Sequence, residues 1–243
     1  IYKIMIDIIF SINVHISVDF LIRQIKNIDE FVSLNYIIII NPNKYMYNEI
    51  LKCDFITSKK YIILNDYLEK KRDHGTLTHG IYLNMKRAIN NYKFKYFIIM
   101  SSRNLFYNKL NKENYNSLVK NDEGKYYKNL KHNEWQWPSF LRTELSKYIK
   151  KNNLLFSNSA HEGLTFDYNS CLKIIEFLDN NDNIKNNLFT WKKCVEEFAL
   201  QTICINTTGC YYLIGKWCGH DKCDFKNIKN LPKNKYLYKT LIP

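Results

Sequence analysis

Apolar residues in the first hundred positions gather into short, nearly continuous runs, separated by longer segments of helical periodicity. The runs are Ile4–Val14, Tyr36–Ile40 and Lys95–Met100, and Asp54–Leu64 also has the composition of an extended segment. Continuous apolar runs of this length are typical of strands that are buried on both faces of a sheet. The pattern therefore predicts four strands in this part of the chain.

Two helices are predicted between these strands. Ser17 is placed to cap the first, with Asp19 in its first turn, and Thr78 begins the second. Their inward-facing positions follow helical spacing: Leu21, Ile22, Ile25 and Ile28 in the first, and Ile81, Met85, Ala88, Ile89 and Tyr92 in the second. Alternation of buried strands with helices indicates an α/β fold with a mostly parallel sheet and helices on both faces.

Sheets of this kind bind ligands at the carboxyl ends of their strands. Polar residues follow three of the predicted strands, at Asn13–His15, at Asn41 and at Ser101–Asn104. We therefore expect a ligand site at the edge where these segments meet.

The second half of the chain has a weaker pattern. Positions 108–133 are polar and rich in Lys, Asn and Tyr, which predicts an excursion on the surface. Further helices are predicted after Ser139 and Asp167 as caps and over Val195–Ile203, and a strand over Cys210–Ile214. Because the chain has no internal repeat and no glycine-serine linker, it is expected to form a single domain over residues 1–243.

The chain carries 36 Lys and Arg against 23 Asp and Glu, a formal net charge of +13. A protein this basic attracts anions, whether nucleic acid, phosphorylated small molecules or an acidic membrane surface. The coding bias of an AT-rich genome explains the charge equally well, since Lys greatly outnumbers Arg and Ile, Asn and Tyr are heavily used. No apolar run approaches the ~20 residues of a membrane helix, so no membrane span is expected.

The chain has seven cysteines, which are too few for a disulfide scaffold in 243 residues. This sparse use of cysteine is typical of proteins in a reducing compartment. Cys210, Cys218, His220 and Cys223 are residue types that bind zinc, but their spacing is not that of a standard zinc knuckle, which favours ordinary thiols. Asn206-Thr207-Thr208 is a glycosylation sequon by pattern and points instead to a secretory compartment.

Several nucleotide-binding and catalytic motifs are absent from the sequence. It contains neither G-x-G-x-x-G nor G-x-x-x-x-G-K-[ST], and no G-x-S-x-G. No two Asp residues stand two apart, so the D-x-D pattern by which many sugar-nucleotide enzymes hold a divalent metal is missing. If the ligand is a diphosphate, Lys and Arg side chains are therefore expected to neutralise it.

Two segments contain candidate functional side chains. Glu196 and Glu197 lie between apolar residues, and a carboxylate in a partly apolar cleft is suited to act as a general base. The alternative is a solvated first turn of a helix, where Glu favours the helix dipole. In the second segment, Glu134, Trp135 and Trp137 have the character of a sugar-binding surface, and the alternative is a pair of tryptophans anchored in the core.

Taken together, these segments resemble the core-2/I-branching enzyme-like glycosyltransferases, the family that includes the peptide O-xylosyltransferases. Val195–Ile203 is similar to the family's Pro-Asp-Glu-x-x-x-x-Thr motif, with Glu197 at the position of the catalytic base. Val14-His15 resembles the end of the family's first strand, and Phe97–Phe106 its Leu-Ser-Gly-x-Asp-Tyr-Pro segment, with Ser102 in place of Gly and Asn104 in place of Asp. Asn41 stands where the family has Asp at the end of the second strand, and His161 stands near the Trp of the family's Gly-Ser-x-Trp segment.

The resemblance implies a GT-A-like nucleotide-sugar domain that inverts the anomeric centre and needs no metal or other cofactor. It implies a nucleotide-binding half at 1–107 and an acceptor and catalytic half at 108–243. The donor is expected to be a UDP-sugar, carrying N-acetylglucosamine or xylose, and the acceptor a hydroxyl of a glycan or protein. The nucleotide would contact Val14, His15, Asn41, Ser102, Lys233 and Lys235, and the acceptor Asn104, Glu134, Trp135, Trp137 and Glu196.

Two other functions stay open at this point. The charge and the many tyrosines suit a nucleic-acid-binding protein. However, the sequence has no aromatic RNP-type motif and no acidic metal cluster, so we predict that nucleic acid is not the partner. The departures at Asn41, Asn104 and His161 suit an inactive relative that only binds UDP or sugar.

A cytoplasmic location is expected from the absence of a visible signal peptide, and a secretory lumen is the alternative if an N-terminal anchor has been removed.

Overall fold

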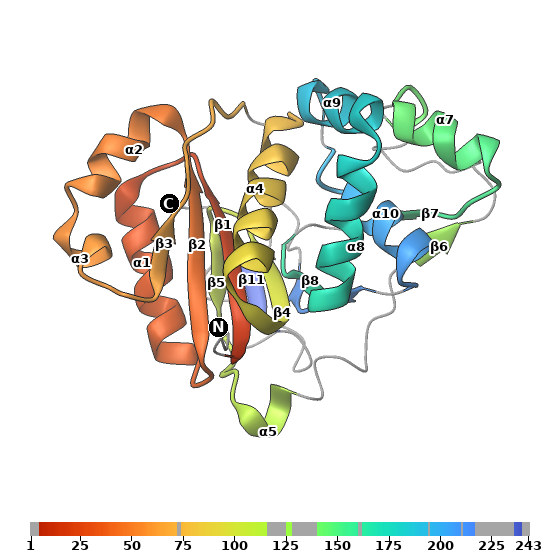
Figure 1. The fold of residues 1–243 in the computed structure, drawn as a ribbon. Coiled ribbons are helices and arrows are strands. Elements are labelled where there is room, and N and C mark those ends of the chain that lie inside the picture. The colour runs from red at the N-terminus through yellow and green to blue at the C-terminus, as the bar shows by residue number, and fades with distance from the viewer. Residues whose placement is uncertain are drawn as a thin grey trace.

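A computed structural model describes residues 5–71, 74–115, 125–127, 140–159, 162–193, 195–209, 211–216 and 236–239. Its centre is a six-stranded sheet in the order β3-β2-β1-β4-β8-β9 (Figure 1). The strands are β1 (Met5–Val14), β2 (Tyr36–Pro42), β3 (Ile62–Leu64), β4 (Lys93–Met100), β8 (Leu164–Asp167) and β9 (Tyr212–Leu213). The four apolar segments of the first hundred residues thus supply four neighbouring strands.

These four strands run parallel to one another. β1 lies between β2 and β4, with Phe10 opposite Ile38 on one side and opposite Ile98 on the other. β3 pairs in parallel with β2, whereas β8 is antiparallel to β4 and β9 antiparallel to β8. The prediction of a mostly parallel sheet is therefore confirmed.

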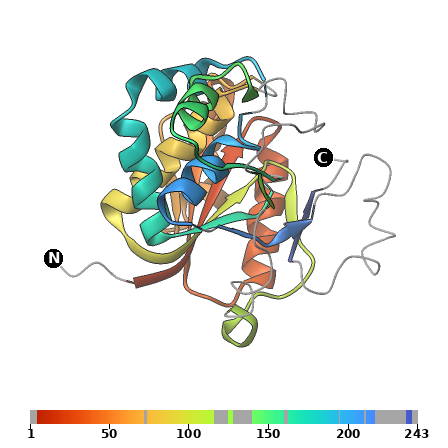
Figure 2. The same ribbon diagram turned by 90° about the vertical axis from the view of Figure 1, so that its right-hand side faces the viewer.

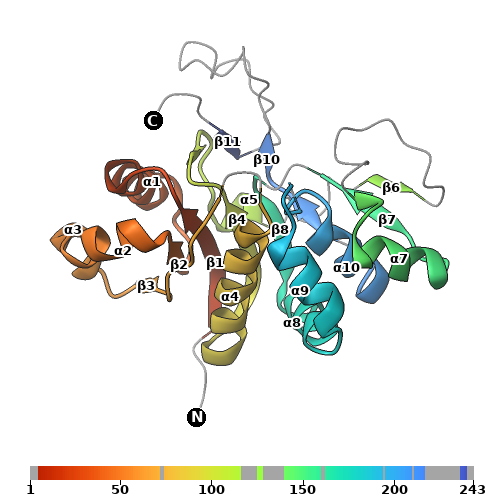
Figure 3. The ribbon, with the colours of Figure 1, turned by 90° about the horizontal axis from the view of Figure 1, so that it is seen from above.

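Alternate residues of the strands enter two separate hydrophobic cores. Ile9, Ile39 and Phe97 belong to the core beneath α4 (Thr76–Asn91), whereas Phe10 and Ile38 belong to the core beneath α1 (Val18–Phe31). The α1 side also includes α2 (Lys44–Leu51) and α3 (Asp54–Thr57), and the α4 side includes α7 (Glu144–Lys151), α8 (Tyr168–Asp179), α9 (Asp182–Thr190) and α10 (Ala199–Thr207). Figure 3 shows α1 on one face of the sheet and α4 and α8 on the other, so the prediction of helices on both faces is also confirmed.

The other described elements are small. β5 (Asn104–Phe106) pairs antiparallel with β11 (Leu237–Lys239), which pairs in parallel with β10 (Gly215–Lys216). β6 (Lys125–Tyr127) pairs antiparallel with β7 (Phe156–Asn158), and α5 (Lys112–Tyr115) is a single turn. Figure 2 shows β10 and β11 beside the main sheet; through them, residues near the C-terminus reach the segment that follows β4.

Local capping explains where several helices begin. The Ser17 hydroxyl accepts a hydrogen bond from the backbone N–H of Phe20 at 3.1 Å, and the Asp167 carboxylate accepts one from Ser170 at 2.6 Å. Both residues are the N-caps that the sequence predicts, of α1 and α8. The helix expected after Ser139 is instead α7, capped by Thr143, whose hydroxyl accepts from the N–H of Ser146 at 3.1 Å.

Other boundaries differ from the sequence prediction. Asp54–Thr57 is helical and only Ile62–Leu64 is a strand, because Asp54 favours a helical first turn and only Ile56 of that turn is buried. α4 begins two residues earlier than expected, and α10 begins at Ala199, four residues later. Helices α2 and α9 were not predicted, and among the described residues no helix is long and apolar enough to cross a membrane.

Candidate functional site

The carboxyl ends of β1, β2 and β4 lie side by side. Asn13 is opposite Asn41 in the β1–β2 ladder, and Ile12 is opposite Met100 in the β1–β4 ladder. The backbone N–H of Asn43 continues the first ladder with a 2.7 Å bond to the carbonyl of Val14. The three polar segments that the sequence singles out therefore meet at one edge of the sheet, which Figure 3 views from above.

The turn after β4 is held by buried amide side chains. Gln24 of α1 is fully buried, and its Nε2 donates to the carbonyls of Ser101 at 2.9 Å and Asn104 at 2.8 Å. The Asn104 Oδ1 accepts from the N–H of Ser101 at 2.6 Å, and its Nδ2 donates to the carbonyl of Tyr238 at 3.3 Å. Both ends of the Asn104 amide are thus engaged by backbone, and its contact with an acceptor stays a prediction.

A buried lysine holds the end of β2. The ammonium of Lys70, which is 7% exposed, donates to the carbonyls of Asn41 and Pro42 at 2.8 Å each and to the Asn41 Oδ1. The Asn41 Nδ2 in turn donates to the carbonyl of Asp66. Asn41 is therefore a fully buried link between β2 and the 65–71 loop, and the nucleotide contact expected of it stays a prediction. Nothing in the sequence distinguishes Lys70 from a surface lysine.

The buried ammonium predicts a pH-dependent stability. Burial lowers the pKa of Lys70 from its ordinary 10.5 to about 7. Between these two values the unfolded chain binds a proton that the folded protein does not, so the free energy of unfolding rises with pH across that window. Between pH 7 and 8.5, Lys70 is expected to add about 1.5 kcal/mol to the stability.

Urea unfolding at both pH values checks this prediction, with Lys70→Met as the variant that lacks the titrating group. Other groups contribute the same pH dependence to both proteins, so the difference between the two slopes isolates Lys70. Equal slopes in wild type and variant would contradict the prediction, because Lys70 would then remain charged throughout the window.

Helix α4 meets the same edge through small and polar residues. The Asn13 Nδ2 donates to the carbonyl of Leu77 at 2.8 Å. Gly80 approaches so closely that a Cβ there would lie 2.3 Å from the Asn13 Oδ1 and 2.6 Å from the Asn41 Oδ1. One turn further on, the Asn84 Nδ2 donates to the Ser11 hydroxyl at 3.0 Å and the Ile39 carbonyl at 3.1 Å. These contacts place the first turns of α4 directly against the ends of β1 and β2.

The glutamate pair lies in the turn that precedes α10. Glu196 is 3% exposed and Glu197 is half-buried, and Phe198 is the N-cap of the helix. The backbone carbonyl of Glu197 accepts from the N–H of Ser159 at 3.0 Å, and the carbonyl of Glu196 accepts from the Gln201 Nε2 at 3.1 Å. The alternative of a solvated first helical turn is therefore wrong for Glu196, whereas for the half-buried Glu197 the role of general base stays a prediction.

The residues just before β8 contact the edge of the sheet. The N–H of Gly163 donates to the carbonyl of Ile99 at 2.8 Å, close to the carboxyl end of β4. Glu162, which precedes Gly163, is 2% exposed. Sequence reasoning did not single out Glu162 as a buried carboxylate.

The remaining predicted residues divide into two groups. Val14 and Ser102 are buried at the edge, and His15 is half-buried there, its carbonyl accepting from the Tyr45 hydroxyl at 2.8 Å. Outside the described residues lie Glu134, Trp135, Trp137, His161, Cys210, Cys218, His220, Cys223, Lys233 and Lys235. In the described part of the chain, no three His, Cys, Asp or Glu side chains gather as a metal site would require, and Cys53, Cys171 and Cys204 are not in disulfide bonds.

Comparison with known proteins gives weak structural likenesses, and one of them is described here. No protein-family model matches the sequence, and no curated protein matches it. Among solved structures, the fold is similar to that of the mannosyltransferase Ktr4p from S. cerevisiae, with a TM-score of 0.32 and 15% sequence identity over 80% of this chain. The match covers 52% of that protein, so this chain spans about half of its length. The described residues have a mixed α/β architecture with a mostly parallel sheet.

Proposed function

We propose that this protein is a glycosyltransferase that moves a sugar from a UDP-sugar to an acceptor hydroxyl, with inversion at the anomeric carbon and Glu197 as general base. The observation that carries the proposal is the place of Glu197, which is half-buried in a turn whose backbone is bonded to Ser159. Ser159 lies four residues before Gly163, and the N–H of Gly163 is bonded to Ile99 near the end of β4. A nucleotide at the carboxyl edge of the sheet would bring its sugar toward that turn.

In this reaction the Glu197 carboxylate accepts the proton of the acceptor hydroxyl. The acceptor oxygen forms a bond to the anomeric carbon while the bond from that carbon to the diphosphate oxygen breaks. UDP leaves on the opposite side and carries away the electron pair. Glu197 is half-buried, and Val195 and Phe198 beside it in the chain are fully buried, so its carboxylate is partly shielded from bulk water.

Metal independence belongs to the same proposal. The turn after β4 reads Ser101-Ser102-Arg103-Asn104 and has no carboxylate. Cations of the protein would therefore balance the charge that develops on the departing diphosphate. Lys233 and Lys235 are candidates, because they shortly precede Tyr236, whose N–H donates to the carbonyl of Ile214 at 2.9 Å.

A panel of nucleotide sugars tests the proposed function. UDP-N-acetylglucosamine, UDP-xylose, UDP-glucose and GDP-mannose would be compared by thermal stabilisation and by release of the nucleotide diphosphate, each with magnesium and with EDTA. We expect UDP-sugars to raise the Tm and to release UDP equally in both conditions. Stabilisation by UDP without turnover of any sugar nucleotide would identify a binding protein instead, and salt-sensitive binding to arbitrary DNA without any response to UDP would favour a nucleic-acid function.

A further inference from the structure

Three basic side chains gather around the start of α4. The N–H of Lys71 donates to the Thr76 hydroxyl at 3.2 Å, which brings the end of the 65–71 loop to the first residue of the helix. On the other side, the N–H of Gly75 donates to the carbonyl of Trp191 at 2.8 Å, so that Lys192 follows directly from this contact. His74 lies between these two contacts. We call Lys71, His74 and Lys192 the α4 basic cluster.

The positive charge of this cluster is not balanced by the described part of the chain. Lys71 and Lys192 are exposed, and neither forms an ion pair within the described ranges. Asp66 and Glu69, in the same loop as Lys71, are also exposed and make no ion pair with it. The first turn of α4 has no acidic residue, so the positive end of the helix dipole adds to the charge of the lysines.

The third member, His74, is arranged as a neutral hydrogen-bond donor. Its Nδ1 accepts from the N–H of Thr76 at 3.3 Å, which leaves the proton of the neutral ring on Nε2. Burial and the nearby charges of Lys71 and Lys192 lower the pKa of His74, in keeping with the neutral form.

A separate observation in the same turn also indicates a ligand or ordered solvent. The Thr78 hydroxyl is fully buried and has no hydrogen-bond partner in the described residues. An unsatisfied buried hydroxyl in a native protein requires an explanation such as a bound water or ion. Asn13, whose Oδ1 is likewise unsatisfied, joins this turn to the end of β1 through its bond to Leu77.

We propose that the α4 basic cluster binds the phosphate groups of a phosphorylated ligand and, if the proposed function is correct, the diphosphate of the nucleotide sugar. The two lysines supply charge, the His74 ring supplies a neutral donor, and the start of a 16-residue helix supplies a favourable dipole. The cluster adjoins the predicted nucleotide contacts, because Lys70, next to Lys71, donates to the backbone of Asn41 and Pro42. In this proposal Lys71, His74 and Lys192 take the role that the family resemblance implies for Lys233 and Lys235.

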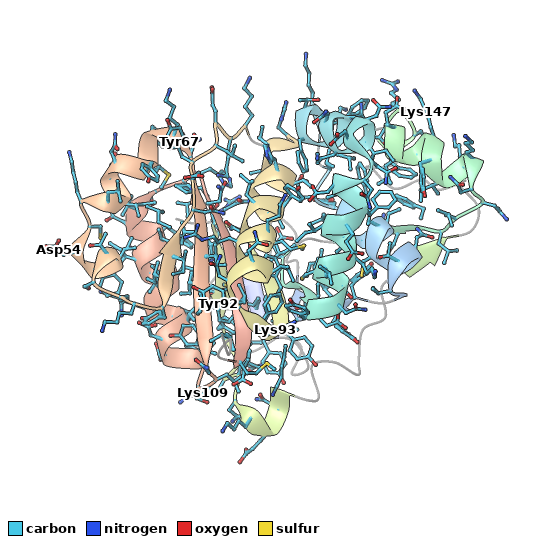
Figure 4. All side chains as sticks on the ribbon, in the orientation of Figure 1. Asp54, Tyr67, Tyr92, Lys93, Lys109 and Lys147 are labelled. Carbon is cyan, nitrogen blue, oxygen red and sulfur yellow. The ribbon has the colours of Figure 1, made fainter. Side chains whose placement is uncertain are left out.

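The test measures binding of inorganic pyrophosphate, UDP and uridine by titration calorimetry. The double variant Lys71→Gln/Lys192→Gln is compared with Lys60→Gln/Lys109→Gln, which removes the same charge from exposed lysines elsewhere. Lys109 lies at the opposite end of the molecule in Figure 4, and Lys60 precedes the amino end of β3. We expect the cluster variant to bind pyrophosphate and UDP at least about tenfold more weakly, which corresponds to 1.4 kcal/mol, and uridine unchanged.

Each result bears on one proposal or the other. UDP that binds the cluster variant as tightly as the wild type would overturn the cluster and leave the glycosyltransferase proposal standing. Equal weakening in the control variant would also overturn it, because net charge alone would then explain the effect. Pyrophosphate binding that depends on the cluster, in a protein that turns over no nucleotide sugar, would support the cluster and reject the proposed function. Absence of pyrophosphate and UDP binding by the wild type would overturn the cluster.

Discussion

Glu197→Gln is expected to lower the rate of sugar transfer by at least ~100-fold, the usual contribution of a positioned general base. The amide has nearly the shape of the carboxylate but cannot accept the acceptor's proton at neutral pH. The Glu197 side chain is not expected to contact the nucleotide. The Kd for UDP is therefore expected to stay within about twofold of the wild-type value. Single-turnover transfer and UDP calorimetry measure the two quantities on the same protein.

Two further variants separate loss of the base from loss of structure. Glu30→Gln makes the same substitution at an exposed position of α1 and is expected to keep full activity. Glu197→Asp keeps a carboxylate but withdraws it by one methylene, so partial activity is expected. The acidic limb of the pH–rate profile is expected to persist in Glu197→Asp and to be lost in Glu197→Gln. A Glu197→Gln enzyme with unchanged transfer would reject the mechanism.

The main sheet and its two helical layers could be predicted because both depend on short-range patterns. Buried parallel strands need apolar residues on both faces, and Tyr36–Ile40 and Lys95–Met100 have no other stable environment. The caps Ser17 and Asp167 act on backbone groups three residues away, so their role is readable from sequence alone. The start of α10 was not readable, because the turn at 195–198 contains no Gly or Pro that would mark a boundary before the helix.

The candidate site depends on long-range contacts that no local pattern encodes. Lys70 is buried only because the 65–71 loop folds back over the end of β2, and in sequence it is one lysine among many. The α4 basic cluster joins residues from two segments more than a hundred positions apart, through the contact of Gly75 with Trp191. The aromatic segment with Trp135 and Trp137 lies outside the described residues, so its role stays a prediction.

Gly163→Ala is expected to destabilise the protein by about 3 kcal/mol or more. Gly163 has a φ of +77°, where a side chain is strained by about 1–2 kcal/mol. In addition, a Cβ at this position would lie 2.4 Å from the backbone nitrogen of Gly215 and 2.7 Å from its Cα. Backbone cannot move aside as a flexible side chain can, so overlap adds about 1–3 kcal/mol.

Gly209→Ala is the matched control for this prediction. Gly209 also has a positive φ, of +91°, but nothing lies within 4 Å of the position that a Cβ would take. Its substitution is therefore expected to cost only the backbone strain, about 1–2 kcal/mol. The difference between the two variants in urea unfolding measures the overlap between Gly163 and Gly215, and equal losses would show that these two glycines do not pack as closely as described.

Because Glu162 precedes Gly163 and the N–H of Gly163 is bonded to Ile99, relief of that overlap would also displace the segment that joins the Glu197 turn to the end of β4. Gly163→Ala is therefore expected to reduce sugar transfer even at temperatures where the variant remains folded.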